Sequence, residues 1–535
     1  MVLFVVLLAG AVLASGVWCA TSALRAAART GVSIRPRLTA GAVALGVVVG
    51  TGALLRVVLV PPHHAMYLDE PWYAEAACNL ARSGRPVLCE TTWSGIECRA
   101  YEKGLGWPVL LAAWARVFGC HTASGIAINR ALGSMTVFLV ALGVRCAGGR
   151  WPQAILAAAL LAIHPVHVVW SSTGETNVSA AAMFLAGLCG ALLYLRTGRA
   201  SAATLAVSGL GLATAIRPEL GLPGIISGAV MALTASTPAR SRAAAGGATV
   251  LICGAAIASG LGLWRMNESI SGGAFLSLGN IVQNALPLLS ASALLAPAVI
   301  PITALCGAVA IAQSESRVVW LLGCAGIAAA LAVLAYDRFD ERMLLSSTVA
   351  LLPLSGFSLS RSTPRVGRAP RDTIRRIIAA TAIAATTTWV VALRSDSVPS
   401  ETQLLETRIA ARFADAPRDP TALVIAAHPA VLAASGTTPA MSIETALRDR
   451  PGLEHAIDGG RPVYFLCDMY CEADFRGSAT ASPCGTVLDG FELAPVVEEA
   501  LHTRRYGLYR VTAVSKRGGA PPRCPHVGRS DSEGG

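Results

Sequence analysis

The sequence predicts an α-helical polytopic membrane protein with about twelve spans and a small C-terminal α/β domain. Hydrophobic residues make up 54% of the 535 residues and charged residues only 14%, where globular proteins carry about 25% charge. The apolar residues form blocks of about 16 to 25 that are almost free of charge, which is the length that crosses a bilayer core. Composition therefore excludes a soluble multidomain protein and the collagenous, disordered and small secreted classes.

The apolar blocks give the expected spans. Twelve are drawn: 2–23, 38–60, 127–147, 152–170, 177–195, 201–216, 219–235, 245–264, 286–312, 317–335, 343–360 and 376–393. The two shortest flank Arg217-Pro218-Glu219 and are compatible with one re-entrant or broken pair. No positive stretch precedes the first block, so we interpret it as a retained span rather than a signal peptide.

The arginines define the expected sidedness. Alternate loops hold seventeen arginines and two acids; the arginines are Arg25, Arg29, Arg35, Arg37, Arg145, Arg150, Arg196, Arg199, Arg240, Arg242, Arg317, Arg361, Arg365, Arg368, Arg371, Arg375 and Arg376. Because positive loops stay in the cytoplasm, the other loops, including 61–126 and 394–535, are expected to face outward. The net charge of +11 is spread over loops rather than one face, which argues against nucleic acid as a partner.

Cysteines support this sidedness. The outward segments hold two sets of four: Cys78, Cys89, Cys98 and Cys120, then Cys467, Cys471, Cys484 and Cys524. Even numbers suit disulfide pairing in an oxidising compartment. Three pairings are open within each set. A zinc site at Cys467, Cys471 and Cys484 is the alternative to disulfides in the second set.

The sequence divides into four expected parts. Residues 1–37 form an extra N-terminal span with a cytoplasmic Arg loop, 38–393 the transmembrane domain, 394–517 an outward α/β domain and 518–535 a loose end. Within the outward loop, 105–119 is apolar but short, which favours a helix lying at the membrane interface.

Expected strands and helices alternate in the C-terminal domain. The strand-like runs are TALVIAA (421–427), RPVYFLC (461–467) and YGLYRVTAV (506–514), and the helix-like runs are SIETALRDR (442–450) and APVVEEALH (494–502).

The first outward loop begins with two adjacent carboxylates, Asp69 and Glu70, within ten residues of a span end. Partial desolvation at a membrane boundary raises the pKa of a carboxylate and makes it a better base. An acidic turn in solvent is the alternative for an isolated Asp-Glu pair. A helix-like AEAACNLARSG follows at 74–84.

Cations also stand at expected outward span ends. Lys103 is one of only two lysines, and a compact ammonium there fits an anionic phosphate, although a lysine reaching to the interface is the alternative. The arginines at such ends are Arg130, Arg217, Arg338 and Arg342. Glu175 is a further acid on this side. Charges at such depths are costly and usually functional or paired, so we expect these groups to converge on one outward cavity.

These residues resemble the first outward loop of C-type (GT-C) glycosyltransferases. The similarity rests on an Asp-Glu after a span with an aromatic nearby (Tyr73), on Tyr-x-Lys-Gly-Leu at 101–105, on the interfacial helix and on Asn129-Arg130-Ala131-Leu132. The branch it resembles is the protein O-mannosyltransferase and aminoarabinose transferase group (family 39-like). The resemblance covers roughly 38–393 and is concentrated in 66–132.

The resemblance implies transfer of a sugar from a polyprenyl-phosphate donor at the outer face. It implies Asp69 as catalytic base with Glu70 in support, and Lys103 and Arg130 on the donor phosphate. From their position at outward span ends, we expect Arg217, Arg338 and Arg342 to be further phosphate ligands. Glu175 and Tyr73 would serve as acceptor-binding groups or a secondary acid. The sequence departs from the family at Gly104 and Leu105, which replace prolines, and in its extra first span.

One-step displacement would invert the anomeric centre. The implied partners are the lipid donor, membrane lipid and a protein, lipid or glycan acceptor. No cofactor is required; a divalent metal at Asp69, Glu70 and Glu175 is compatible with the sequence, but no His/Cys ligand pattern demands one. The main alternative is a secondary transporter of a polar or anionic solute, although no inverted repeat is visible. The Arg and Ala bias indicates a GC-rich bacterium and hence its plasma membrane.

Overall fold

A computed structural model describes most of the helices and the C-terminal sheet. The described residues are 36–60, 69–93, 95–101, 103–121, 123–234, 238–264, 295–313, 315–335, 341–359, 421–426, 439–467, 491–501 and 504–514, with positions 14, 279, 281–282, 419 and 429. The expected spans 2–23 and 376–393 and the loose end 518–535 lie outside them.

The chain separates into two compact units. The helical unit comprises residues 1–62, 102–110 and 125–398, and the mixed unit comprises 63–101, 111–124 and 399–535. The first outward loop of the sequence is therefore divided between the two.

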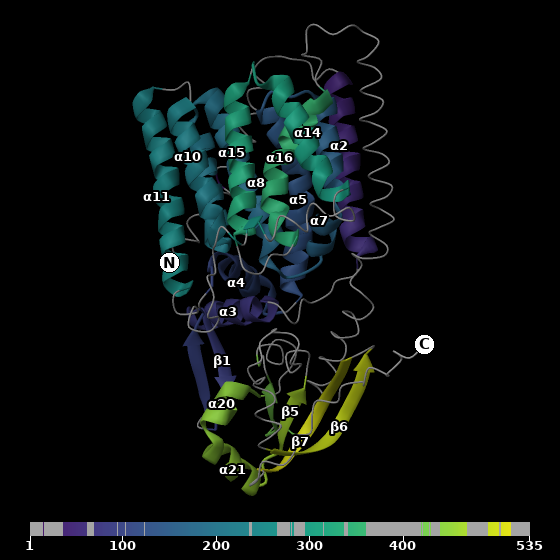
Figure 1. The fold of residues 1–535 in the computed structure, drawn as a ribbon, viewed down its shortest axis with the longest axis vertical. Coiled ribbons are helices and arrows are strands. Elements are labelled where there is room, and N and C mark those ends of the chain that lie inside the picture. Colours follow the sequence, from purple (N-terminus) through teal and green to yellow (C-terminus); the bar gives the residue numbers. More distant parts are fainter. Residues whose placement is uncertain are drawn as a thin grey trace. The chain divides into compact units, whose positions relative to one another are not determined.

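Helices build the described part of the helical unit (Figure 1). In chain order they are α2 (Pro36–Leu54) continued by the π-helix η1 (Leu55–Leu59), α5 (Ser124–Cys146), α6 (Trp151–Ala162), α7 (Pro165–Trp170), α8 (Thr176–Thr197), α9 (Ala200–Ile216), η2 (Pro218–Leu220), α10 (Gly221–Thr234), α11 (Ala239–Trp264), α14 (Leu295–Ile311), α15 (Ser316–Leu334), η3 (Glu341–Leu344), α16 (Leu345–Gly356) and η4 (Phe357–Leu359). Helix α4 (Gly106–Phe118) begins in this unit and ends in the mixed unit.

Several helices are long and apolar enough to span a bilayer. Among the described residues five stretches qualify: Gly41–Val58, Ser124–Cys146, Thr176–Thr197, Ala239–Ala258 and Ser316–Leu334. Shorter apolar helices include Trp151–Ala162, Ala200–Ile216 and Pro218–Thr234. The prediction of a polytopic helical membrane protein is confirmed.

The expected span 152–170 is two helices rather than one. Helix α6 ends at Ala162, and α7 begins at Pro165 after His164 takes an extended conformation. Proline lacks the N–H that would continue the ladder and disfavours helical geometry in the residue before it. The His164 ring accepts a hydrogen bond from the His167 backbone N–H, which starts the second helix.

Helix α8 packs against α9, α15 and α16, and nearly all of it is buried. Figure 1 shows α8 beside α15 and α16. Its contact with α9 is backbone against backbone. A Cβ placed on Gly187 would lie 2.7 Å from the Leu210 nitrogen, and one on Gly190 would lie 2.5 Å from the Ala206 nitrogen. Glycine is therefore required at both positions for the two helices to approach this closely.

Arg-bearing loops meet at one end of α8. Arg196, near its C-terminus, forms an ion pair of 2.7 Å with Glu315, which precedes α15. The same guanidinium donates to the Ala147 carbonyl oxygen after α5. Residues 171–175, which belong to one of the expected outward loops, directly precede α8 and so lie at its opposite end.

The mixed unit combines a helix, a hairpin and a five-stranded sheet. Its elements are α3 (Glu70–Ser83), β1 (Val87–Thr91), β2 (Ile96–Ala100), β3 (Leu423–Ala426), β4 (Ala440–Ser442), α20 (Ile443–Arg448), α21 (Arg450–Asp458), β5 (Val463–Cys467), β6 (Phe491–Leu501) and β7 (Arg504–Val514). The large sheet has the order β4-β3-β5-β7-β6, with β3 parallel to β4 and β5 and with β7 antiparallel to its neighbours. The expected C-terminal α/β domain is confirmed.

The run 494–502 was expected to be helical, and this prediction is wrong. Residues 491–501 form strand β6, which pairs with β7 along its length. Glu498, Glu499 and Ala500 favour helix locally, but pairing with β7 overrides that preference. The register shifts between Pro495 and Val497, and such irregularities accommodate a proline, which cannot donate to the ladder.

An apolar core lies under the sheet of the mixed unit. It contains Leu423, Ile425, Phe465 and Val511 from the strands and Leu453 from α21, all buried. The strand runs at 421–427, 461–467 and 506–514 were predicted as strands, and the structure places β3, β5 and β7 there.

Candidate active site

Residues 171–175 connect α7 to α8 at the predicted outward end of the bundle. Ser171, Ser172 and Thr173 have no exposed surface, and Glu175, the residue before α8, is 4% exposed. Buried backbone that is not helical needs protein groups as hydrogen-bond partners. We call this segment the α7–α8 loop, and its contacts show which side chains gather around it.

Neutral groups from two other helices fix the α7–α8 loop. The Asn129 amide of α5 donates to the carbonyl oxygens of Thr173 (2.8 Å) and Glu175 (2.6 Å). The Trp107 indole N–H of α4 donates to the Gly174 carbonyl oxygen at 2.8 Å. Asn129 and Trp107 are both fully buried, so the loop is held by rigid, desolvated partners.

Three arginines contact three successive residues where α7 ends and this loop begins. The Arg342 guanidinium lies 4.4 Å from the centroid of the Trp170 ring. Arg56 donates through Nε to Ser171 Oγ at 3.2 Å, and Arg130 donates through Nε to Ser172 Oγ at 3.4 Å. The three belong to η3, η1 and α5. We call Arg56, Arg130 and Arg342 the arginine cluster.

Arg56 is the innermost member of the cluster and has no exposed surface. Its guanidinium donates to the carbonyl oxygens of Gly52 (2.6 Å) and Ala162 (3.3 Å), and it lies 2.6 Å from Nδ1 of His167. A buried arginine inside an apolar span is costly unless its donors are satisfied. Here it fastens η1 to the end of α6 and to α7.

Arg130 is only partly buried and is bound to the same region. Its Nη2 donates to the Val60 carbonyl oxygen at 2.7 Å, and the Ser172 hydroxyl donates to the Arg56 carbonyl oxygen at 3.0 Å. Both of these partners of Arg130, the Val60 carbonyl oxygen and the Ser172 hydroxyl, are neutral, so these contacts do not cancel its charge.

A second polar group lies where α9 ends. Arg217 forms an ion pair with Glu219 and also donates to the Asn177 side chain of α8. Both members of the pair are mostly buried, with 14% and 7% of their side chains exposed. Asn177 stands two residues after Glu175, so this pair adjoins the α7–α8 loop.

Lys103 lies near the end of α9, because the residues that follow it pack against that end. A Cβ on Gly104 would lie 2.7 Å from the Ile216 carbonyl oxygen, and one on Gly106 would lie 2.5 Å from the Ile216 nitrogen. The segment can therefore touch the end of α9 only with glycine at these positions. This contact accounts for a glycine at position 104.

The helical unit thus brings together several of the predicted residues at one end of the bundle, namely Lys103, Arg130, Glu175, Arg217 and Arg342. Arg338 lies outside the described residues. Arg56 was missed, because the expected span 38–60 was taken as one apolar block. Its signal in the sequence is that it is the single charge within that block.

Asp69, Glu70 and Tyr73 belong to the mixed unit, at the start of α3. The Tyr73 hydroxyl donates to Asp69 Oδ2 at 3.2 Å. The Tyr73 ring meets the Tyr101 ring edge-on at 6.3 Å between centroids. Glu70 is 4% exposed. Asp69 thus directly precedes α3 and is partly buried, and Glu70 is the buried first residue of the helix.

Comparison with known protein structures shows which fold this chain has. ArnT from Cupriavidus metallidurans bound to undecaprenyl phosphate matches over 87% of this chain and 97% of its own, with a TM-score of 0.56 and 13% identity. The archaeal oligosaccharyltransferase AglB from Archaeoglobus fulgidus, in complex with an inhibitory peptide and a dolichol-phosphate, matches over 85% and 72%, with a TM-score of 0.52 and 13% identity. The chain has the fold of the GT-C glycosyltransferases.

The sequence itself matches no family model and no curated protein. The apo form of ArnT gives the same fold result, with a TM-score of 0.57 at 14% identity. The resemblance drawn from residues 66–132 thus agrees with the fold of the whole chain.

Proposed function

We propose that this protein transfers a sugar from a polyprenyl-phosphate-linked donor to an acceptor hydroxyl at the outer face of a bacterial plasma membrane. The observation that carries the proposal is the arginine cluster, in which Arg56, Arg130 and Arg342 meet the α7–α8 loop within a GT-C fold. ArnT and AglB are described with undecaprenyl phosphate and dolichol-phosphate, which supports a lipid phosphate as the anion.

Each proposed role follows from charge. The acceptor oxygen attacks the anomeric carbon, the bond from that carbon to the phosphate oxygen breaks, and Asp69 receives the acceptor proton. The departing lipid phosphate gains negative charge, which Arg130, Lys103 and Arg342 neutralise as it develops. Glu70 supports Asp69. Because one displacement occurs, the anomeric configuration inverts.

Arg56 has a different role in this proposal. It has no exposed surface, so it acts by holding Ser171, to which its Nε donates. Glu175 and Tyr73 are proposed to contact the acceptor. The sugar and the acceptor class, whether protein, lipid or glycan, are left open. No step needs a metal, and the nucleic-acid class has no support.

The test is sugar transfer in proteoliposomes with labelled polyprenyl-phosphate sugars. We expect Asp69→Asn to lower kcat by about 10²–10⁴-fold, the usual loss of a general base. Arg130→Gln should raise the KM for the donor by about tenfold or more, since a charge-assisted contact is lost. Arg196→Gln removes a cation from the Glu315 pair at the other end of α8 and is the matched control, with both constants within about threefold of wild type.

Transfer by Asp69→Asn at the wild-type rate would refute the role of Asp69. Equal donor KM values for Arg130→Gln and Arg196→Gln would refute the phosphate site. Uptake of a polar or anionic solute into the same proteoliposomes, without sugar transfer, would instead support the transporter alternative.

A further inference from the structure

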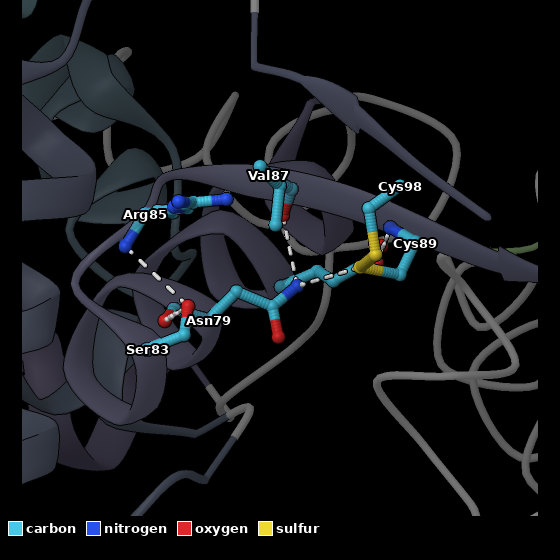
Figure 2. Close-up of a disulfide and its surroundings, with 7 residues drawn as sticks. Asn79, Ser83, Arg85, Val87, Cys89 and Cys98 are labelled. Carbon is cyan, nitrogen blue, oxygen red and sulfur yellow. Dashed lines mark hydrogen bonds between the residues drawn. A yellow bond between two sulfur atoms is a disulfide. The ribbon is translucent and has the colours of Figure 1, made fainter. Parts of the chain in front are cut away.

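Helix α3 and the β1–β2 hairpin form one rigid piece within the mixed unit. The Asn79 amide of α3 donates to the Val87 carbonyl oxygen at 2.8 Å, and the Glu75 carboxylate accepts the Cys89 backbone N–H. A disulfide joins Cys89 to Cys98 across the hairpin. Figure 2 shows Asn79 reaching from the helix toward the strand and the disulfide. A displacement of the hairpin is therefore transmitted to α3.

The hairpin is also bound to the C-terminal sheet domain through Glu90. Its Oε2 accepts the Ser442 backbone N–H at 2.7 Å, and its Oε1 accepts the Thr445 hydroxyl at 2.8 Å. Both oxygens of one carboxylate thus hold residues more than 350 positions away in sequence. Hydrogen bonds to an ionised group are about twice as strong as neutral ones.

Trp93, in the turn of the hairpin, reinforces this attachment. Its side chain packs against the apolar core of the C-terminal domain. A Cβ on Gly452 would lie 2.4 Å from Cδ1 of Trp93, so the glycine leaves the space that the indole fills. An aromatic side chain buries a large area when it packs. The Trp93 indole therefore strengthens the attachment of the hairpin to the C-terminal domain.

We propose that Glu90 is a positioning residue, through which the C-terminal domain fixes the helix that carries Asp69. The proposal rests on the proposed function, because it assigns the domain a part in that reaction. Asp69 directly precedes α3, α3 is bonded to β1, and β1 is bonded to α20 through Glu90. An error of about 1 Å in the placement of a reacting group costs about 10²-fold in rate, so loosening this connection should slow transfer.

The hairpin offers a matched control in Glu97. Glu97 lies directly opposite Glu90 in the strand register. Its side chain is 57% exposed and lies 3.9 Å from Arg448, whose side chain is 71% exposed. An exposed pair of this kind contributes little. Glu90→Gln and Glu97→Gln remove the same charge from the same hairpin, and only the first also removes one of the two acceptor oxygens, and the charge behind both, from the hydrogen bonds of Ser442 and Thr445.

The experiment compares these variants in single-turnover sugar transfer with enzyme in excess. The rate constant then does not depend on the fraction of protein that is folded. We expect Glu90→Gln to lower it by tenfold or more with the donor KM within threefold, and Glu97→Gln to change neither by more than twofold. Thr445→Val removes the hydroxyl partner from the domain side. It should lower the rate constant as well, and the double variant should be no slower than Glu90→Gln alone.

Rate constants for Glu90→Gln and Thr445→Val within twofold of Glu97→Gln would overturn the positioning role while wild-type transfer remained intact. Additive losses in the double variant would also overturn it, because the two residues would then act separately. If Glu90→Gln does not accumulate, Thr445→Val decides the question. No transfer by the wild type would refute the proposed function instead.

Discussion

The helical unit and the mixed unit hold their buried charges with opposite sets of neutral groups. In the helical unit, the cation of Arg56 donates to the carbonyl oxygens of Gly52 and Ala162. In the mixed unit, carboxylates accept from donors: Glu75 from the Cys89 N–H and Glu90 from the Ser442 N–H. A charge held by neutral dipoles is stabilised without being cancelled. One unit thus holds a buried cation, and the other holds carboxylates.

The largest effect should come from Arg56, which tests the cation side of this comparison. Arg56→Met leaves several carbonyls, Ser171 and His167 without their donor. Removing one partner of a buried network costs about 2–4 kcal/mol, so the thermal unfolding midpoint in detergent should fall by several degrees. Arg196→Gln, at the exposed Glu315 pair, should cost less than about 1 kcal/mol. Equal midpoints for the two variants would show that the hydrogen bonds of Arg56 do not stabilise the folded protein.

A second prediction uses the cysteines to separate the two units. The structure pairs Cys89 with Cys98 and leaves Cys78 and Cys120 as thiols that lie near one another. If this unit faces an oxidising compartment, these two are the remaining pair of the first set, and thiol–disulfide exchange should join them. The bond would stabilise the mixed unit by about 2–4 kcal/mol.

Non-reducing peptide mapping by mass spectrometry should recover Cys78 linked to Cys120. Cys189 and Cys253, buried in the helical unit, should be recovered as thiols. Burial raises the pKa of the Cys78 thiol to about 12, so formation should be slow with small oxidants. A fully free Cys78 in protein purified from membranes without reductant would contradict the pairing and the assigned sidedness.

The smallest predicted effect is the pH dependence of stability that Glu75 causes, and it tests how the mixed unit holds its carboxylates. Burial raises the pKa of Glu75 from 4.5 to about 7, and Glu90 adds to the rise, while the Cys89 N–H and Arg99 oppose it. The folded state therefore holds the proton to a higher pH than the unfolded state. The contribution to stability is full below about pH 4.5, declines between about 4.5 and 7, and is absent above.

Glu75→Gln should remove this pH dependence and raise the free energy of unfolding of the mixed unit at pH 8 by about 1–2 kcal/mol. Hydrogen exchange of strand β1 at pH 5 and pH 8 measures it. Glu97→Gln, which alters an exposed carboxylate on the same hairpin, should keep the wild-type slope. An unchanged slope in Glu75→Gln would show that this carboxylate stays charged when folded.

The lengths of the apolar blocks and the residue composition of the strand-like runs were sufficient to predict the helix bundle and most of the C-terminal sheet. Apolar blocks such as 177–195 and 317–335 correspond to α8 and α15, because apolar length alone decides a span. Strand β6 was not predicted correctly, since its pairing with β7 depends on residues elsewhere in the chain. The β1–β2 hairpin was not predicted either.

The candidate site was predicted in part. Arg130, Arg217 and Arg342 stood out because they lie next to expected span ends, where charge is scarce. Arg56 lies inside an apolar block, and its many apolar neighbours keep the hydrophobicity of that block high. Dividing the sequence into apolar blocks and charged loops therefore does not single it out. The role of Glu90 was not visible in the sequence, because its partners Ser442 and Thr445 are brought to it only by the fold.

The glycine contacts between α8 and α9 bear on how the chain is made. Gly187 and Gly190 let the two helices touch along their backbones, and only residues 198 and 199 separate the helices in sequence. Two apolar helices that fit so closely and are separated by so few residues can associate as soon as both have been synthesised. We therefore expect α8 and α9 to enter the bilayer as a ready-made pair, around which later helices assemble.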